Sequence, residues 1–132
     1  MKIIYIDGKR LYYAFLSGAQ EVIANKKELN RINLFPVADG DTGSNLSRTL
    51  SVVKNEVVKD NSLTITLDSM GEAALKGAIG NSGIIFAQFI NGLKNSVDRE
   101  DNINVNKFAQ AVENAVHYTY QGINNPIQLS LL

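Results

Sequence analysis

Apolar residues recur along the chain mainly at helical spacing, three or four positions apart. Such spacing places them on one buried face of an amphipathic α-helix. The strongest stretches run from Leu11 to Val22, from Leu46 to Val57, from Ile84 to Leu93 and from Val105 to Val116. We therefore predict an all-α fold of about six helices, organised as a single domain over residues 1–132.

Polar residues predict where the first two helices begin. Asp7 is a suitable N-cap for the first helix. Asn25 followed by Glu28 resembles a capping box that opens a short second helix. We expect this second helix to run out near residues 33–36, where a proline follows.

Three segments are expected to interrupt the helical pattern. Residues 63–66 have a β-like composition but no evident partner strand, so we interpret them as an extended connector before a fourth helix near 67–78. Residues 80–83 are a polar glycine turn that opens the fifth helix. Residues 95–104 are polar and charged, which predicts a surface connection whose last residue, Asn104, caps the sixth helix.

Composition narrows the range of functions. Thirteen basic and thirteen acidic side chains give a formal net charge of zero, so we expect no binding to nucleic acid or to an anionic membrane. Cysteine is absent, which excludes disulfides, thiolate nucleophiles and cysteine-based metal sites. No apolar run approaches the roughly 20 residues of a membrane span, and no signal peptide is evident. We expect a cytoplasmic protein.

The segment Asp39-Gly40-Asp41-Thr42-Gly43-Ser44-Asn45 carries the most informative chemistry. Two carboxylates, followed by hydroxyl and amide groups, offer the hard oxygen ligands that Mg²⁺ prefers. Mg²⁺ can bridge such carboxylates to ATP phosphates, and the start of the following helix presents free N–H groups to an anion. A plain turn with an N-cap is the alternative interpretation. An EF-hand is excluded because Leu50 stands where its closing Glu should fall.

A second glycine-rich segment, Gly80-Asn81-Ser82-Gly83, also places small residues and hydrogen-bond donors at a helix start. Taken alone, it is also typical of close helix packing with Ser82 as a cap. If the two openings face each other, one can hold metal and the other phosphate. Neither is a P-loop or a Rossmann fingerprint, because the Gly-Lys-Ser/Thr ending and a preceding strand are absent.

Together these motifs resemble a known family. The long motif Asn33-x-Phe35-Pro36-Val37-x-Asp39-Gly40-Asp41-Thr42-Gly43-Ser44-Asn45, followed later by Gly80-Asn81-Ser82-Gly83, is similar to the DAK2 domain. This is the ATP-binding domain of dihydroxyacetone (glycerone) kinases and of the bacterial fatty acid kinase A subunit. Asp7-Gly8-Lys9-Arg10 and Gly18-Ala19 also resemble the latter subfamily. The resemblance covers essentially the whole chain.

The resemblance implies an antiparallel barrel or bundle of amphipathic helices that binds ATP or ADP with two Mg²⁺ ions at one end. Asp39 and Asp41 match the family's metal-binding aspartates, and Asn33 falls near a third aspartate of the glycerone-kinase branch. The residues that match the two phosphate-binding turns are Thr42, Gly43, Ser44, Asn45, Gly80, Asn81, Ser82 and Gly83. A separate fatty-acid-binding protein of the DegV type is the implied partner.

The resemblance is incomplete at the end of the chain. Asn125-Pro126-Ile127 resembles the family's Asn-Pro-Val/Ile, but Gln128-Leu129-Ser130 replaces the Glu-Gly-Thr expected next. We therefore expect about six of the family's eight helices, with the C-terminal third of the domain missing. An incomplete barrel would expose apolar helix faces, which predicts self-association to a homo-oligomer and an isolated chain without activity.

The expected function is that of an ATP-dependent kinase domain acting on a fatty acid presented by the acyl-binding partner. A subunit of the glycerone-kinase type is one alternative. A non-catalytic module that binds Mg²⁺ and phosphate, or only associates with itself or a partner, is the other.

Overall fold

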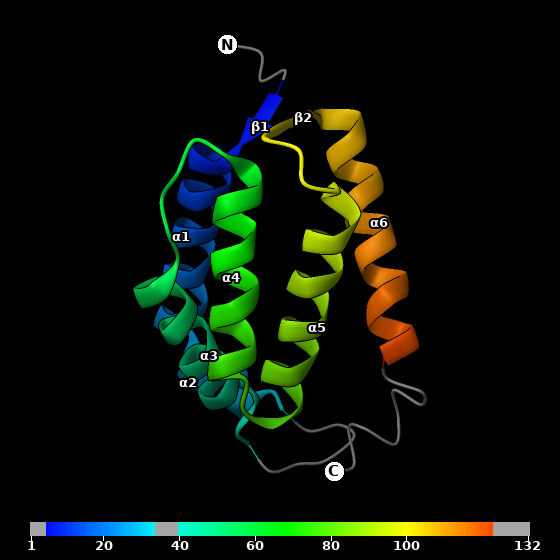
Figure 1. Ribbon diagram of the computed structural model, residues 1–132. Helices are drawn as coiled ribbons and strands as arrows, with labels where there is room; N and C mark the ends of the chain where they lie inside the picture. Colours follow the sequence, from blue (N-terminus) through cyan, green and yellow to red (C-terminus); the bar gives the residue numbers. More distant parts are fainter. Residues whose placement is uncertain (1–4, 34–39, 123–132) are drawn as a thin grey trace.

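The computed structural model describes residues 5–33 and 40–122, which form a bundle of helices with a small sheet at one end (Figure 1). The elements in chain order are β1 (Tyr5–Asp7), α1 (Gly8–Ala24), α2 (Lys26–Arg31), α3 (Thr42–Glu56), α4 (Leu63–Gly77), α5 (Gly80–Val97), β2 (Asn102–Asn104) and α6 (Val105–Gly122). Six helices within these residues confirm the predicted all-α fold. None of them is long and apolar enough to cross a membrane. The predicted metal ligand Asp39 and the family-like segment Asn125-Pro126-Ile127 lie outside the described residues.

Helix α4 forms the centre of the core. Its residues Leu63, Leu67 and Met70 are at most 1% exposed, and they join Val53 of α3 and Ile90 of α5 in one apolar cluster. Full burial of a side chain of this size contributes about 1.5–3 kcal/mol. The packing on α4 therefore fixes α3 and α5 relative to each other.

Two three-residue strands form an antiparallel pair that the apolar pattern did not predict. Ile6 of β1 is the register partner of Ile103 of β2, and Ile103 is buried in the core cluster. The surface connection predicted at 95–104 is wrong in this respect, because α5 continues to Val97 and the connection ends in β2. Strands this short show no recognisable alternation, so their pairing depends on packing against the helices.

The extended connector predicted at 63–66 is also wrong, because these residues form the first turn of α4. Ser62 is the N-cap, and its hydroxyl accepts a hydrogen bond from the Ile65 N–H at 3.3 Å. Three of the four residues are buried. β-branched residues have only slightly lower helix propensity than others, and this burial outweighs the difference.

Two predicted N-caps are confirmed. Asp7 Oδ1 accepts from the Arg10 N–H at 2.9 Å, and Asn104 Oδ1 accepts from the Lys107 N–H at 2.7 Å. Asp7 ends β1 and Asn104 ends β2, so the two caps set where α1 and α6 leave the sheet.

The short helix α2 follows Asn25 as predicted, but its side-chain capping and its end differ from the prediction. The Asn25 side chain makes no cap, because Nδ2 donates to the Glu21 carbonyl oxygen at 2.8 Å. Glu28, the expected capping-box partner, is paired with Arg31, and this hydrogen bond lowers the pKa of the Glu28 carboxyl. The helix ends at Arg31, before residues 33–36.

Candidate functional site

The two glycine-rich openings, the first turns of α3 and α5, are in contact at the end of the bundle away from the sheet (Figure 1). The Ser82 hydroxyl in α5 donates a hydrogen bond to the Thr42 carbonyl oxygen in α3 at 3.1 Å. Gly80 lies against Asn45, since a Cβ added to Gly80 would stand 2.2 Å from Asn45 Nδ2. The condition left open by the sequence, that the two openings face each other, is therefore met.

The start of α5 requires glycine for two reasons. Gly80 has φ of +67°, in the left-handed region that residues with a Cβ rarely adopt, and it has no room for a Cβ beside Asn45. Gly83 packs on α3, where an added Cβ would lie 2.3 Å from Thr49 Oγ1. Asn81, between them, is half-buried. Close packing thus accounts for the glycines, but Ser82 bonds to α3 and does not cap α5.

Thr49 ties α3 to the connection between α4 and α5. Its side chain is fully buried, and Oγ1 lies 3.0 Å from the carbonyl oxygens of Asn45 and Gly77. The same oxygen accepts a hydrogen bond from the Ile79 N–H at 3.3 Å. Because Ile79 directly precedes α5, this hydroxyl fixes the start of α5 against the middle of α3.

The opening of α3 is capped by two asparagines that precede it. Asn33 Oδ1 accepts from the N–H groups of Asp41 and Thr42 at 3.2 and 3.1 Å. Asn30 holds Ser44 at two points, because Oδ1 accepts from its N–H at 2.9 Å and Nδ2 donates to its hydroxyl at 2.8 Å. Most of the donors that the sequence assigned to phosphate at this turn therefore already have partners.

The opening of α5 differs in this respect. Within the described residues no side chain caps it, and the residue at the N-cap position is the apolar Ile79. The first N–H groups of a helix have no partner within the helix, and they carry the positive end of its dipole. The first turn of α5 therefore offers an anion the donors that α3 has given to asparagine side chains.

Asp41 occupies the N-cap position of α3, yet its carboxylate does not cap the helix. Since Asn33 performs that role, a turn with a capping aspartate does not account for the Asp41 side chain, which is exposed. Within residues 5–33 and 40–122, no group of three or more His, Cys, Asp or Glu side chains gathers around a possible metal position. Asp41 is the one predicted acidic ligand in that part of the chain.

An apolar groove of about 390 Å³ lies beside Ser82, between α3, α5 and α6. Its aromatic walls are Phe86 and Phe89 of α5 and Tyr120 of α6, and Tyr120 is 61% exposed. The rest of its lining is apolar except for two hydroxyl side chains: Leu46, Ser82, Ile85, Val116 and Thr119. A flat apolar group bound here would lie next to the opening of α5.

Sequence reasoning missed Asn30 and Thr49. Thr49 could have been predicted from the sequence, because it adjoins the apolar Leu50 and Val53 on the buried side of α3. Buried hydroxyls are nearly always hydrogen-bonded. Asn30 left none, since it stands in a short polar stretch and its partner Ser44 is fourteen residues away.

The chain is similar in sequence to a known domain family and to several bacterial proteins. The family model of the DAK2 domain matches residues 36–128. Protein YloV of Bacillus subtilis (strain 168) is 31% identical over 134 residues, which cover 100% of this chain and 24% of that protein. Uncharacterised proteins of Staphylococcus epidermidis (strain ATCC 12228) and Staphylococcus aureus (strain USA300) are 31% and 30% identical, each over 96% of this chain. The chain spans about a quarter of the length of these curated relatives.

Proposed function

The chain belongs to the DAK2 domain family, and on that premise we propose that it binds Mg²⁺·ATP across the two helix openings. DAK2 domains bind ADP or ATP, so the family supplies the class of ligand. The observation that carries the proposal is the contact between α3 and α5, in which Ser82 meets Thr42. Two adjoining helix N-termini concentrate N–H donors and positive dipole ends, as binding of a polyphosphate requires.

In this proposal the two openings have different tasks. The phosphates lie against the first turn of α5, where Gly80, Asn81, Ser82 and Gly83 supply backbone N–H groups and two polar side chains. Thr42, Gly43, Ser44 and Asn45 form the facing wall, which Asn30 holds in place. The support for this division is that side chains already cap α3, whereas none among the described residues caps α5.

Asp41 is the proposed Mg²⁺ ligand of the described residues, together with Asp39 as the motif implies. An exposed carboxylate that takes no part in capping fits that role. To act as a third ligand, Asn33 Oδ1 would have to lose at least one of the two hydrogen bonds that it now accepts from backbone N–H groups. We therefore give Asn33 a positioning role first, since it fixes the backbone of Asp41. Bound Mg²⁺ would supply neutralisation of the phosphate charge.

The groove beside Ser82 is the proposed site of the nucleotide base. Phe86, Phe89 and Tyr120 provide aromatic faces on which a flat ring can stack. Comparing ATP with inorganic tripolyphosphate isolates the contribution of the base. ATP should bind more tightly, and Tyr120→Ala should reduce that difference because it removes a ring on which the base would stack. The Tyr120 side chain is mostly exposed, so its removal should cost little stability. Equal affinity of the two ligands for the unaltered chain would contradict the placement.

The proposed reaction of the whole protein is phosphoryl transfer from ATP to a fatty acid presented by a DegV-type acyl-binding protein. The domain would act by positioning the nucleotide and neutralising charge, without a covalent intermediate. The chain spans about a quarter of its relatives, so selection of the acceptor is assigned to other segments or to the partner. A glycerone-kinase reaction is the alternative, and an assay with the two acceptors in parallel separates them.

A non-catalytic association module is the second candidate. The observation that favours it is the open apolar groove, whose Ile85, Val116 and Tyr120 are each more than a third exposed. Such a surface favours association with a second copy or with a partner. Sedimentation velocity tests this directly, because a monomer at high concentration would contradict self-association through the groove.

Calorimetric titration of ATP, with and without Mg²⁺, tests the proposed function. We expect Asp41→Asn to lower the Mg²⁺-dependent affinity at least about tenfold while the fold is retained. Glu72→Gln is the matched control, because it removes an exposed carboxylate of α4 that belongs to neither opening, and it should leave affinity unchanged. Equal affinity of Asp41→Asn and the unaltered chain would contradict the assignment of Asp41.

A further inference from the structure

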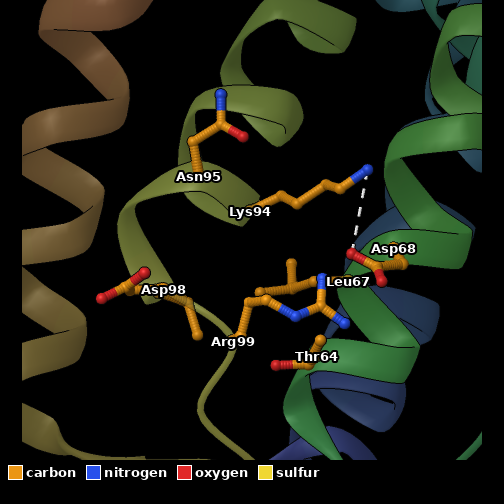
Figure 2. A pocket seen from close by; sticks show the side chains of 8 residues that line it. Thr64, Leu67, Asp68, Lys94, Asn95, Asp98 and Arg99 are labelled. Carbon is orange, nitrogen blue, oxygen red and sulfur yellow. Dashed lines mark ion pairs between the residues drawn. The ribbon is translucent and has the colours of Figure 1, made fainter.

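A second cavity lies at the opposite end of the bundle, between the first turn of α4 and the last turn of α5 (Figure 2). Its volume is about 270 Å³, slightly below the range of typical drug-sized ligand sites, so it suits a small molecule. Lys94 and Gly80 lie fourteen positions apart on α5, which separates this cavity from the proposed phosphate site by roughly 20 Å along the helix. The two sites are therefore distinct.

Two cationic side chains of the cavity lack strong protein partners. Lys94 Nζ has an ion pair with Asp68 Oδ1, but at 3.8 Å the atoms are beyond hydrogen-bond distance. The Arg99 guanidinium has neither a hydrogen bond nor an ion pair with any described residue. In Figure 2 the side chains of Lys94 and Arg99 extend toward α4, whereas the Asp98 carboxylate points away from both. A ligand in the cavity would therefore meet the positive charges of Lys94 and Arg99 and the negative charge of Asp68.

Local packing directs Lys94 into this position. The aliphatic part of Lys94 passes over Gly71 of α4, since a Cβ on Gly71 would lie 3.2 Å from Lys94 Cδ. Its side chain is only 31% exposed. The Lys94 side chain is thus partly buried between two helices and lines the cavity.

The backbone that carries Arg99 has an uncommon conformation. Asp98 and Arg99 have φ of +56° and +61°, so two consecutive residues with a Cβ lie in the left-handed region. Asp tolerates this region fairly well, but Arg does so rarely. These two residues lie in the segment that leads from α5 to β2, and from there the exposed Arg99 lines the cavity.

We propose that this cavity binds a compact oxyanion, a phosphate or carboxylate group, between Lys94 and Arg99. The guanidinium offers paired donors with the geometry of an oxyanion, and the ammonium adds a point charge. Asp68 is the competing anion that holds Lys94 when the ligand is absent. Occupation would link α4 to the turn after α5 through the ligand.

Titration of the ¹⁵N-labelled chain with inorganic phosphate, followed by NMR, tests the proposal. Sodium chloride at matched ionic strength serves as the reference, and succinate is titrated in parallel to distinguish a phosphate from a carboxylate ligand. We expect saturable shifts of the Thr64, Asp98 and Arg99 amides with at least one of the two anions. The amides of Asn81 and Ser82 report separately on the nucleotide site, so failure at one site is distinguishable from failure at the other.

Three variants complete the test. Arg99→Gln should weaken binding at the cavity at least about tenfold, whereas Arg10→Gln, which alters an arginine of α1 outside the cavity, should leave it unchanged. Asp68→Asn should tighten binding, because it removes the competing carboxylate. The proposal is overturned if neither anion gives saturable shifts at the cavity, or if Arg99→Gln and Arg10→Gln bind equally well.

Discussion

The openings of α3 and α5 are similar in sequence but differ in what occupies their N–H groups. At α3, Asn33 and Asn30 accept from the Thr42 and Ser44 N–H groups. At α5, no side chain among the described residues takes that place. A capping side chain and a bound anion compete for the same donors. The comparison therefore separates the first turn of α3, whose N–H groups are capped, from the first turn of α5, whose N–H groups are open to phosphate and which we call the receiving turn. Glycine content alone does not reveal this distinction.

Gly80→Ala should have the largest effect, because it breaks the contact between the openings. The left-handed φ and the collision with Asn45 together should lower the free energy of unfolding by about 2–4 kcal/mol in urea denaturation. ATP binding should be lost with it. Gly18→Ala is the matched control, since a Cβ there meets nothing within 4 Å and should stabilise α1 by about 0.5–1 kcal/mol. Similar losses in both variants would contradict this account.

Thr49→Val should have the next largest effect. The change keeps the volume but leaves the Ile79 N–H without its acceptor, which should lower the free energy of unfolding by about 1–3 kcal/mol. Thr119→Val is the comparison, because among the described residues the Thr119 hydroxyl bonds only to the Ala115 carbonyl oxygen of its own helix. Thermal unfolding of the two variants measures the difference. An equal loss at Thr119 would show that Thr49 does not link the helices.

Asn30→Ala tests the positioning role of α3. Loss of this cap should lower the free energy of unfolding by about 0.5–2 kcal/mol, as measured in urea. ATP affinity should fall only a few-fold, because the N–H groups proposed to bind the phosphates lie on α5. A gain in ATP affinity would contradict the comparison, since it would mean that the phosphates bind the donors released at α3.

Ile79→Ser gives α5 the side-chain cap that it lacks and should have the smallest effect on stability. The extended backbone at Ile79 suits a capping residue, and the gained cap should offset the lost apolar contact to within about 1 kcal/mol. ATP affinity should nevertheless fall several-fold by calorimetry, because the serine oxygen competes with phosphate. Ile79→Val controls for the lost side-chain volume. Equal affinities of the two variants would indicate that the α5 donors are not used.

Much of the fold could be predicted because helical periodicity extends over long stretches. The faces marked by Leu50 and Ile90 are buried as expected, and Asp7 and Asn104 cap as expected. The segment at 63–66 could not be predicted locally, because its β-branched residues become helical through burial against the core. The strand pair was missed for a related reason, since a three-residue strand has no pattern of its own.

The candidate site could be predicted only as two separate motifs. The sequence identifies Asp41 and Ser82 by their residue types, but their proximity depends on how α4 fixes α3 and α5. The capping by Asn30 could not be predicted, because nothing in the chain marks a residue that contacts Ser44 across the α2–α3 loop. The roles of the metal ligands remain predictions from the motif.

The most direct test of the account is NMR titration of the ¹⁵N-labelled chain with Mg²⁺·ADP, which compares the backbone amides of the two openings. We predict that the Asn81 and Ser82 amides move strongly downfield as phosphate accepts their hydrogen bonds. The Thr42 and Ser44 amides should move little, because Asn33 and Asn30 retain them. Strong shifts at Thr42 and Ser44 with none at Asn81 and Ser82 would contradict the assignment of phosphate binding to the opening of α5.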